Sequence, residues 1–141
     1  MIVCADRIRE KTDRRYPYGS VYSEIRARQS FRCDACRKSW ERIFQIDHIV
    51  PLAYAWDMGA RDWTDAMRSR FANDPANLIA VAGQVNQDKG DQPPGAWMPP
   101  NDAFWCQYAV QFIEVLRGYR LAVDEASAQR LRAATQTCPA G

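Results

Sequence analysis

Apolar residues recur at helical spacing most clearly near the C-terminal end of the chain. The spacing predicts a helix over residues 102–117, with Asp102 as its cap and Gly118 as its end. The apolar side of this helix is formed by Phe104, Tyr108, Phe112 and Val115. Such a stripe is typical of a helix that faces a hydrophobic core.

Weaker periodicity predicts further elements. Helices are expected over residues 21–29, 65–72, 83–89 and 124–136. Thr64 and Asp124 are typical N-caps, and Gly90 is a typical helix end. Short strands are expected over 43–46 and 78–81, where apolar and β-branched residues cluster. Four prolines make 91–101 a loop, and the residues between Pro51 and Thr64 read as a connection.

The last of these helices offers Ala126, Leu131 and Ala134 as apolar contacts. Strands and helices therefore follow one another in mixed order, which indicates an α+β fold. With 141 residues, of which 47% are hydrophobic, the chain is expected to form a single domain over 1–141.

No apolar run approaches the roughly 18 residues that a membrane span needs, so no membrane partner is expected. Charges appear within the first seven residues, which argues against a signal peptide. We therefore expect a cytoplasmic protein.

Charge is distributed unevenly along the chain. Residues 1–45 hold eleven Lys/Arg and six Asp/Glu, whereas residues 46–141 hold eight and eleven. Arginine dominates the basic residues, and its planar fork suits phosphate. The basic N-terminal part therefore predicts either a nucleic-acid surface or a solvated helix face. The candidate nucleic-acid-binding residues are Arg26, Arg28, Arg32, Arg37 and Lys38.

The chain has one histidine, His48, at the end of the first predicted strand. Metal sites that need two histidines are therefore excluded. An imidazole titrates close to neutral pH and suits a general base. A Ser-His-Asp hydrolase would also need one histidine, but the chain has no GxSxG motif.

Other polar residues follow at positions that a strand-strand-helix unit would bring to one face. Asp47 and Asn86 offer oxygen atoms that suit Mg²⁺ or Mn²⁺. Asn77 precedes the second strand and could hold the loop that aims His48, and Lys89 lies one turn after Asn86. Taken singly, each has an ordinary structural explanation: a hydrogen-bonded histidine, a turn asparagine, a surface asparagine or a solvated lysine. Their joint order favours a site.

These motifs resemble a known family. The sequences CDAC, IDHIVPL, NL and NQDK, over about residues 33–90, resemble the HNH endonucleases of the ββα-metal fold. A longer resemblance, over about 47–138, is to the HNH group that includes the C-terminal domain of the GmrSD restriction enzymes. It rests on DHIVPLAYAWDMGARDW, FANDPANLIAV, NQDKGD, AWMPPN and the C-terminal helices.

The resemblance implies a role for each residue. Asp47 and Asn86 would ligate the catalytic metal, and His48 would activate water. Asn77 would orient His48 or brace the site. Lys89 would lie near phosphate or support the loop. It also implies a ββα core with a basic N-terminal segment and a helical elaboration over about 102–138.

The cysteines leave two alternatives open. Cys33 and Cys36 form a CxxC, which is half a zinc site, but the second CxxC of zinc-bearing relatives is absent. An antiparallel pair of C-terminal helices would bring Cys106 close to Cys138. Because a cytosol is reducing, we expect a structural Zn²⁺ held by these four thiolates. The alternatives are a Cys106–Cys138 disulfide, as the resemblance implies for secreted relatives, or a site that uses Cys4 or none.

The resulting hypothesis is a divalent-metal-dependent endonuclease that hydrolyses DNA phosphodiester bonds, of bacterial or phage origin. Its expected substrate is double-stranded DNA, and a homodimer or a larger protein partner would supply specificity. The alternative hypothesis is a non-catalytic nucleic-acid-binding module on an HNH scaffold. Retention of Asp47, His48, Asn77 and Asn86 together favours the enzyme.

Overall fold

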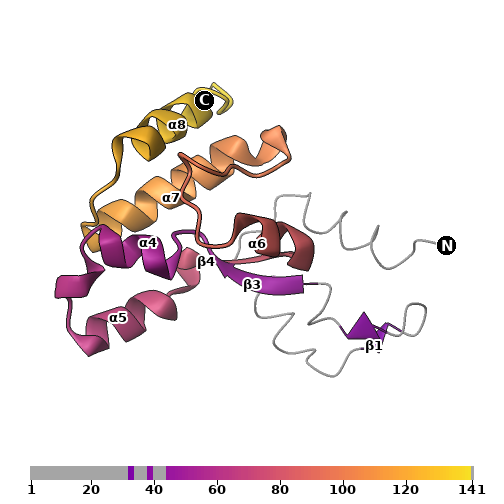
Figure 1. The fold of residues 1–141 in the computed structure, drawn as a ribbon. Helices are drawn as coiled ribbons and strands as arrows, with labels where there is room; N and C mark the ends of the chain where they lie inside the picture. Colours follow the sequence, from indigo (N-terminus) through magenta and orange to yellow (C-terminus); the bar gives the residue numbers. More distant parts are fainter. Residues whose placement is uncertain (1–31, 34–37, 40–43, 141) are drawn as a thin grey trace.

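The structure is a computed structural model that describes residues 32–33, 38–39 and 44–140 (Figure 1). The helix predicted over 21–29 lies outside these residues. Within them, two short strands come first, and a mixture of strands and helices follows. The first pair, β1 (Arg32–Cys33) and β2 (Lys38–Ser39), is antiparallel and encloses the CxxC sequence.

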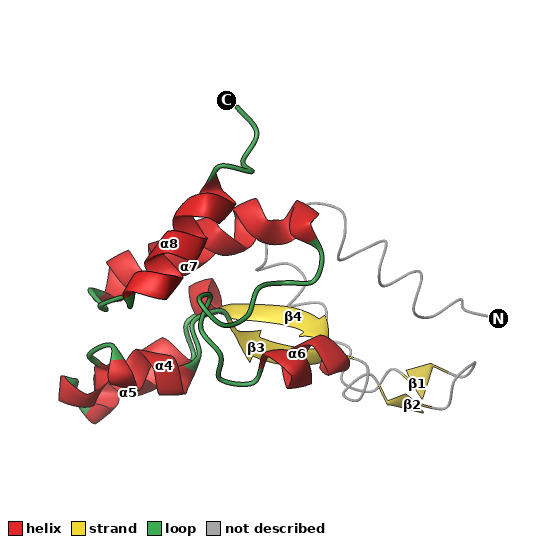
Figure 2. Ribbon diagram, turned by 45° about the horizontal axis from the view of Figure 1, so that its top comes forward, coloured by secondary structure: helices red, strands yellow, loops and turns green. Residues whose placement is uncertain are grey.

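The centre of the fold is a second antiparallel pair followed by a helix. Strand β3 (Phe44–His48) pairs with β4 (Leu78–Ala82), and His48 lies opposite Leu78. Helix α6 (Gly83–Lys89) follows β4 directly and contacts both strands (Figure 2). The predicted α+β class and its ββα core are therefore confirmed.

Local signals explain several helix boundaries. Helix α5 (Asp65–Ala72) begins at Thr64, whose side chain accepts a hydrogen bond from the Met67 N–H. Helix α6 ends at Gly90, which adopts φ of 52°. Because this left-handed conformation is strained for residues with a Cβ atom, glycine suits the position.

Helix α4 (Leu52–Asp57) lies where the sequence predicted only a connection. Its six residues are too few for a periodic signal, and no side chain caps its start. Tyr54 and Ala55 are buried on its inner side. Tertiary packing therefore holds this helix, because a helix of this length is not stable alone.

Helix α7 (Trp105–Tyr119) differs from the prediction at both ends. A 3-10 turn, η3 (Asp102–Phe104), precedes it, and the cap of that turn is Asn101 rather than Asp102. The helix runs through Gly118 and ends where Arg120 takes φ of 54°. The reason is that Tyr119 is buried, and its ring packs edge-on against Phe71 of α5.

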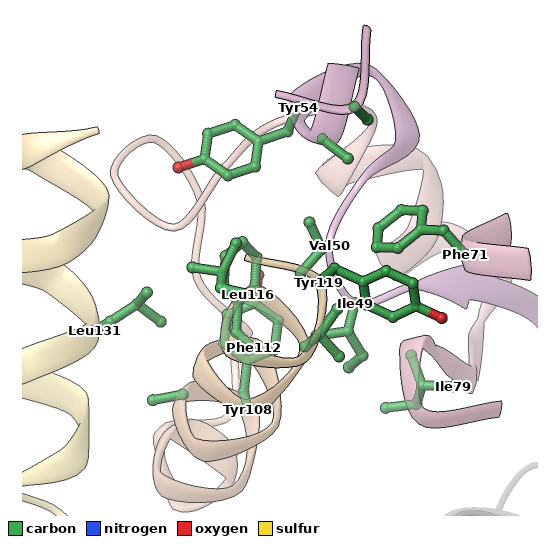
Figure 3. Packing of buried hydrophobic residues seen from close by; sticks show 14 of the residues in the cluster. Ile49, Val50, Tyr54, Phe71, Ile79, Tyr108, Phe112, Leu116, Tyr119 and Leu131 are labelled. Carbon is green, nitrogen blue, oxygen red and sulfur yellow. The ribbon is translucent and has the colours of Figure 1, made fainter. Parts of the chain in front are cut away.

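The core lies between α7 and the layer formed by β4, α4 and the loop after β3 (Figure 3). Of the predicted apolar stripe, Tyr108, Phe112 and Val115 are buried, whereas Phe104 is only partly buried. The largest other contributors to this core are Ile49, Val50, Tyr54, Phe71, Ile79, Leu116, Tyr119 and Leu131. The loop that carries the candidate site is therefore itself part of the core.

Helix α8 (Glu125–Thr135) packs against α7, and Asp124 caps it by accepting a hydrogen bond from the Ser127 N–H. Leu131 and Ala134 are buried as expected, but Ala126 is exposed and Ser127 is fully buried instead. Ser127 lies four residues before Leu131 and seven before Ala134, so it shares their face of α8, and its hydroxyl accepts a hydrogen bond from the Gly95 N–H of the proline-rich loop.

Asp124 also joins α8 to α4, because its carboxylate accepts a 2.8 Å hydrogen bond from the Tyr54 hydroxyl. Burial would raise the pKa of Asp124, but the hydrogen bonds from Ser127 and Tyr54 outweigh it and hold the pKa below its ordinary value. The remaining short elements are the 3-10 turns η1 (Ala60–Asp62) and η2 (Pro75–Asn77). Among the described helices, none has the length and apolar character to cross a membrane.

Candidate active site

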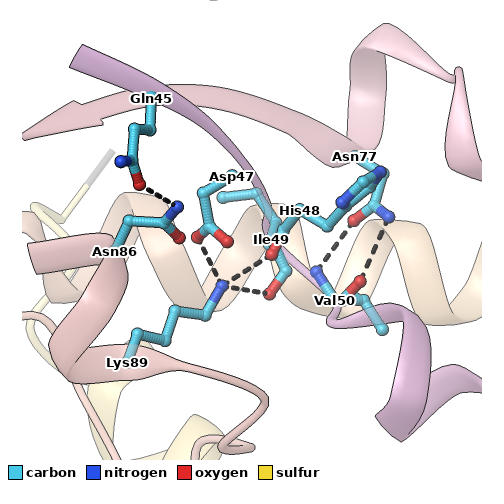
Figure 4. Close-up of polar contacts among 8 residues, drawn as sticks. All are labelled: Gln45, Asp47, His48, Ile49, Val50, Asn77, Asn86 and Lys89. Carbon is cyan, nitrogen blue, oxygen red and sulfur yellow. Dashed lines mark hydrogen bonds and ion pairs between the residues drawn. The ribbon is translucent and has the colours of Figure 1, made fainter. Parts of the chain in front are cut away.

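The chain turns sharply after β3, and Asn77 holds this turn. Asn77 is completely buried. Its side-chain oxygen accepts a 2.8 Å hydrogen bond from the Val50 N–H, and its side-chain nitrogen donates a 3.2 Å bond to the Val50 carbonyl (Figure 4). Its own carbonyl accepts from the Ile49 N–H at 2.9 Å. Asn77 therefore fixes the two residues that follow His48.

The His48 ring is held from the other side by the end of α5. Its Nε2 atom lies 2.9 Å from the Ala72 carbonyl oxygen. Because a carbonyl can only accept a hydrogen bond, this contact assigns the ring hydrogen to Nε2 in the neutral imidazole. The lone pair is then on Nδ1, which is the atom available to accept a proton.

Lys89 is almost completely buried, with 1% of its surface exposed, although lysine is usually solvated. Its ammonium nitrogen lies 2.5 Å from Asp47 Oδ2, 2.6 Å from the His48 carbonyl and 3.3 Å from the Ile49 carbonyl. Three acceptors require three N–H groups, which only the charged ammonium has. Of the two roles predicted for Lys89, the contacts match loop support, because no hydrogen is left for a phosphate.

The ion pair between Lys89 and Asp47 is largely buried. Burial raises the pKa of Asp47 above its ordinary value, against the opposing effect of the Lys89 charge. Burial likewise lowers the pKa of Lys89, against the effect of Asp47. The side chain of Asp47 is nevertheless 13% exposed, so it is not fully closed off from solvent.

Gln45 orients the remaining oxygen donor, and the sequence analysis missed it. The Asn86 side-chain nitrogen donates a 2.8 Å hydrogen bond to Gln45 Oε1. This contact turns the amide oxygen of Asn86 toward the carboxylate of Asp47, as Figure 4 shows. Alternation along a strand places Gln45 and Asp47 on the same face, which is the signal that could have identified it.

The donor set fits a hard divalent ion. Asp47 and Asn86 point oxygen atoms toward each other, and ions such as Mg²⁺ bind through few protein ligands and several waters. Across the described part of the chain, no cluster of three or more His, Cys, Asp or Glu could hold a metal. The structure thus brings Asp47, His48, Asn77, Asn86 and Lys89 together at one end of the β3–β4 hairpin.

The expected four-cysteine zinc site is wrong. Cys106 and Cys138 form a disulfide with a Cα–Cα distance of 4.9 Å, so neither is a thiolate that could ligate zinc. The packing of α7 against α8 explains this pairing, because it brings the start of one helix to the end of the other. Cys33 lies on β1, and Cys36 falls outside the described residues, so zinc at this pair stays a prediction.

The predicted nucleic-acid-binding residues are mostly beyond the described part of the chain. Arg26, Arg28 and Arg37 lie outside it. Arg32 lies on β1 opposite Ser39, and Lys38 lies on β2 opposite Cys33. A phosphate-binding role for these five residues stays a prediction.

Comparison with known protein families gives a match over most of the chain. The family described as GmrSD restriction endonucleases, C-terminal domain, matches residues 6–134. The chain belongs to this family. The description of this family names restriction endonucleases.

One curated relative comes from the fungus Arthroderma benhamiae and bears the name "Uncharacterized secreted protein". It is 47% identical over 95 residues, which is 66% of this chain. The chain spans 47% of the length of that relative. No solved structure matches the chain significantly.

Proposed function

We propose that the GmrSD-type domain is a divalent-metal-dependent endonuclease that hydrolyses DNA phosphodiester bonds. The observation that carries this proposal is the contact between His48 Nε2 and the Ala72 carbonyl, because it leaves Nδ1 with a lone pair. A neutral imidazole held in one orientation is what a general base requires. The side-chain oxygen atoms of Asp47 and Asn86, which suit a divalent metal, point toward each other close to His48.

The reaction begins when His48 Nδ1 takes a proton from a water molecule. The water oxygen forms a bond to phosphorus, and the bond between phosphorus and one sugar oxygen breaks, so the products are a phosphate end and a hydroxyl end. The departing sugar oxygen takes a proton from solvent to become the hydroxyl end, and His48 returns its own proton to solvent. Asn77 keeps the turn after His48 in place throughout.

Asp47 and Asn86 would hold Mg²⁺ or Mn²⁺, which supplies charge stabilisation at the phosphate and the departing oxygen. Lys89 orients Asp47, and Gln45 orients Asn86. Residues 46–141 carry more acidic than basic side chains, so the arginine-rich N-terminal segment is proposed to bind the DNA backbone. Binding then weakens steeply with added salt.

The test is nicking of supercoiled plasmid with Mg²⁺, Mn²⁺ or EDTA. We expect EDTA to stop cleavage and His48→Ala to lower its rate by about 10²-fold or more, which is the size of a general-base effect. Arg132→Met, a change on an exposed part of α8, is the control that keeps the wild-type rate.

Cleavage by the His48→Ala chain at the wild-type rate would remove His48 from the mechanism. Binding of DNA by the wild type without cleavage in any metal would favour the binding-module alternative. Replacing the plasmid with double-stranded RNA tests the choice of DNA.

The compartment follows from the cysteines. Disulfides persist in oxidising compartments and are rare in a reducing cytosol. The Cys106–Cys138 bond and the secreted label of the fungal relative therefore support an oxidising compartment rather than the cytoplasm that the sequence predicted. Alkylation of the protein immediately on isolation tests this proposal. Labelling of Cys106 and Cys138 without prior reduction would contradict it.

A further inference from the structure

Lys89 binds the same carboxylate, that of Asp47, that the proposed metal would use. Its ammonium lies 2.5 Å from one oxygen of Asp47, the only carboxylate among the proposed metal ligands. The inference below rests on the proposed function, because it concerns how that site takes up its metal.

The ammonium cannot move aside when a metal arrives. The side chain is 1% exposed, and all three of its hydrogens have acceptors. Movement of Lys89 would take its donor away from the buried Ile49 carbonyl and the partly buried His48 carbonyl, which is costly. The metal therefore shares the carboxylate with a fixed positive charge.

The charges of the site do not favour a metal in the free protein. The charges of Asp47 and Lys89 cancel, so a divalent ion adds two positive charges that no other ligand balances. An ion bound to Asp47 would share its carboxylate with the ammonium, which lies 2.5 Å from Oδ2. Repulsion between two cations on one carboxylate is strong in a partly buried site. A phosphate of the substrate supplies the missing negative charge.

We propose that Lys89 makes metal loading depend on the nucleic acid. The free protein binds Mg²⁺ or Mn²⁺ weakly, and the phosphate at the scissile bond completes the site and tightens the metal. Because coupling between two ligands is reciprocal, the metal tightens DNA binding by the same factor. Lys89 is thus a positioning residue that also prevents the empty site from taking up metal.

The first experiment measures Mn²⁺ binding without DNA, by the electron paramagnetic resonance signal of the free ion. We expect Lys89→Met to bind Mn²⁺ at least tenfold more tightly than the wild type, because the repelling charge is gone. Arg132→Met also removes one positive charge, but its side chain is 70% exposed on α8, and it should bind Mn²⁺ like the wild type. Equal or weaker binding by a folded Lys89→Met chain would overturn the proposal.

A second experiment does not depend on the folding of the Lys89 variant. In the His48→Ala chain, which is expected to cut DNA at least about 10²-fold more slowly than the wild type, Mn²⁺ affinity is measured with and without a DNA duplex. We expect the duplex to raise the affinity at least tenfold, and an unchanged affinity would overturn the inference. The wild-type plasmid assay separates the two proposals. Metal-dependent cleavage with no such coupling overturns only this inference, whereas cleavage that persists in EDTA overturns the proposed function.

Discussion

The side chain of Asn77 holds the turn that follows His48 in the candidate active site. Replacing it with alanine removes both hydrogen bonds to Val50, at 2.8 and 3.2 Å. Val50 is completely buried, so neither its N–H nor its carbonyl can find water instead. The backbone bond from the Ile49 N–H to the carbonyl of residue 77 survives the substitution.

The expected loss of stability follows from these two groups. A buried polar group left without a partner costs about 1–3 kcal/mol, so the loss of both bonds in Asn77→Ala should destabilise the protein by about 2–6 kcal/mol. This is a large part of the roughly 5–15 kcal/mol that stabilises a typical domain. Asn73→Ala is a matched control, because Asn73 is exposed, and its side chain donates only to the Ser69 carbonyl. It should change the stability by about 0.5 kcal/mol or less.

Urea unfolding, followed by tryptophan fluorescence with the disulfide intact, measures both variants. We expect a lower midpoint for Asn77→Ala with an unchanged slope, which identifies a change in stability. Plasmid cleavage below the transition should also fall, because Val50 lies two residues after His48. A loss below about 1 kcal/mol, or one equal to that of Asn73→Ala, would refute the argument that Asn77 braces the turn.

Three further predictions concern the helices around the site. Because hydrogen bonds hold the folded pKa of Asp124 below its ordinary value, Asp124→Asn should cost about 1 kcal/mol in urea unfolding at pH 7. That difference should shrink as the pH falls below about 4, and a constant difference would contradict it. Changing Cys106 and Cys138 to serine removes a disulfide that joins residues 32 positions apart, and it should lower the free energy of unfolding by about 3–4 kcal/mol. An unchanged urea midpoint would count against this. Gly95→Ala places a Cβ atom about 3.0 Å from the α8 backbone and should cost about 1–3 kcal/mol, whereas Gly118→Ala meets nothing within 4 Å and should stabilise α7 by about 0.5–1 kcal/mol. Equal melting temperatures for these two variants would refute the close approach of the loop to α8.

Local chemistry made several elements readable from the sequence. Thr64 and Asp124 start α5 and α8 because their side chains accept hydrogen bonds from N–H groups within three residues. Gly90 ends α6 because it accepts a left-handed conformation. The grouping of Asp47, His48, Asn77 and Asn86 was readable from the expected strand-strand-helix unit. Pairing of β3 with β4 places His48 opposite Leu78, beside Asn77, and α6, which follows β4 directly, carries Asn86.

Long-range contacts determined what the sequence left open. Lys89 and Asp47 are separated by 42 residues, and Gln45 and Asn86 by 41. No local pattern therefore reveals that Lys89 is buried against Asp47 or that Gln45 orients Asn86. The helix α7 continues through Gly118 because Tyr119 packs against α5. Cys106 and Cys138 form a disulfide because α7 and α8 lie side by side. In each case the outcome depends on which residues from a distant part of the chain pack against the group. Only the tertiary structure contains that information.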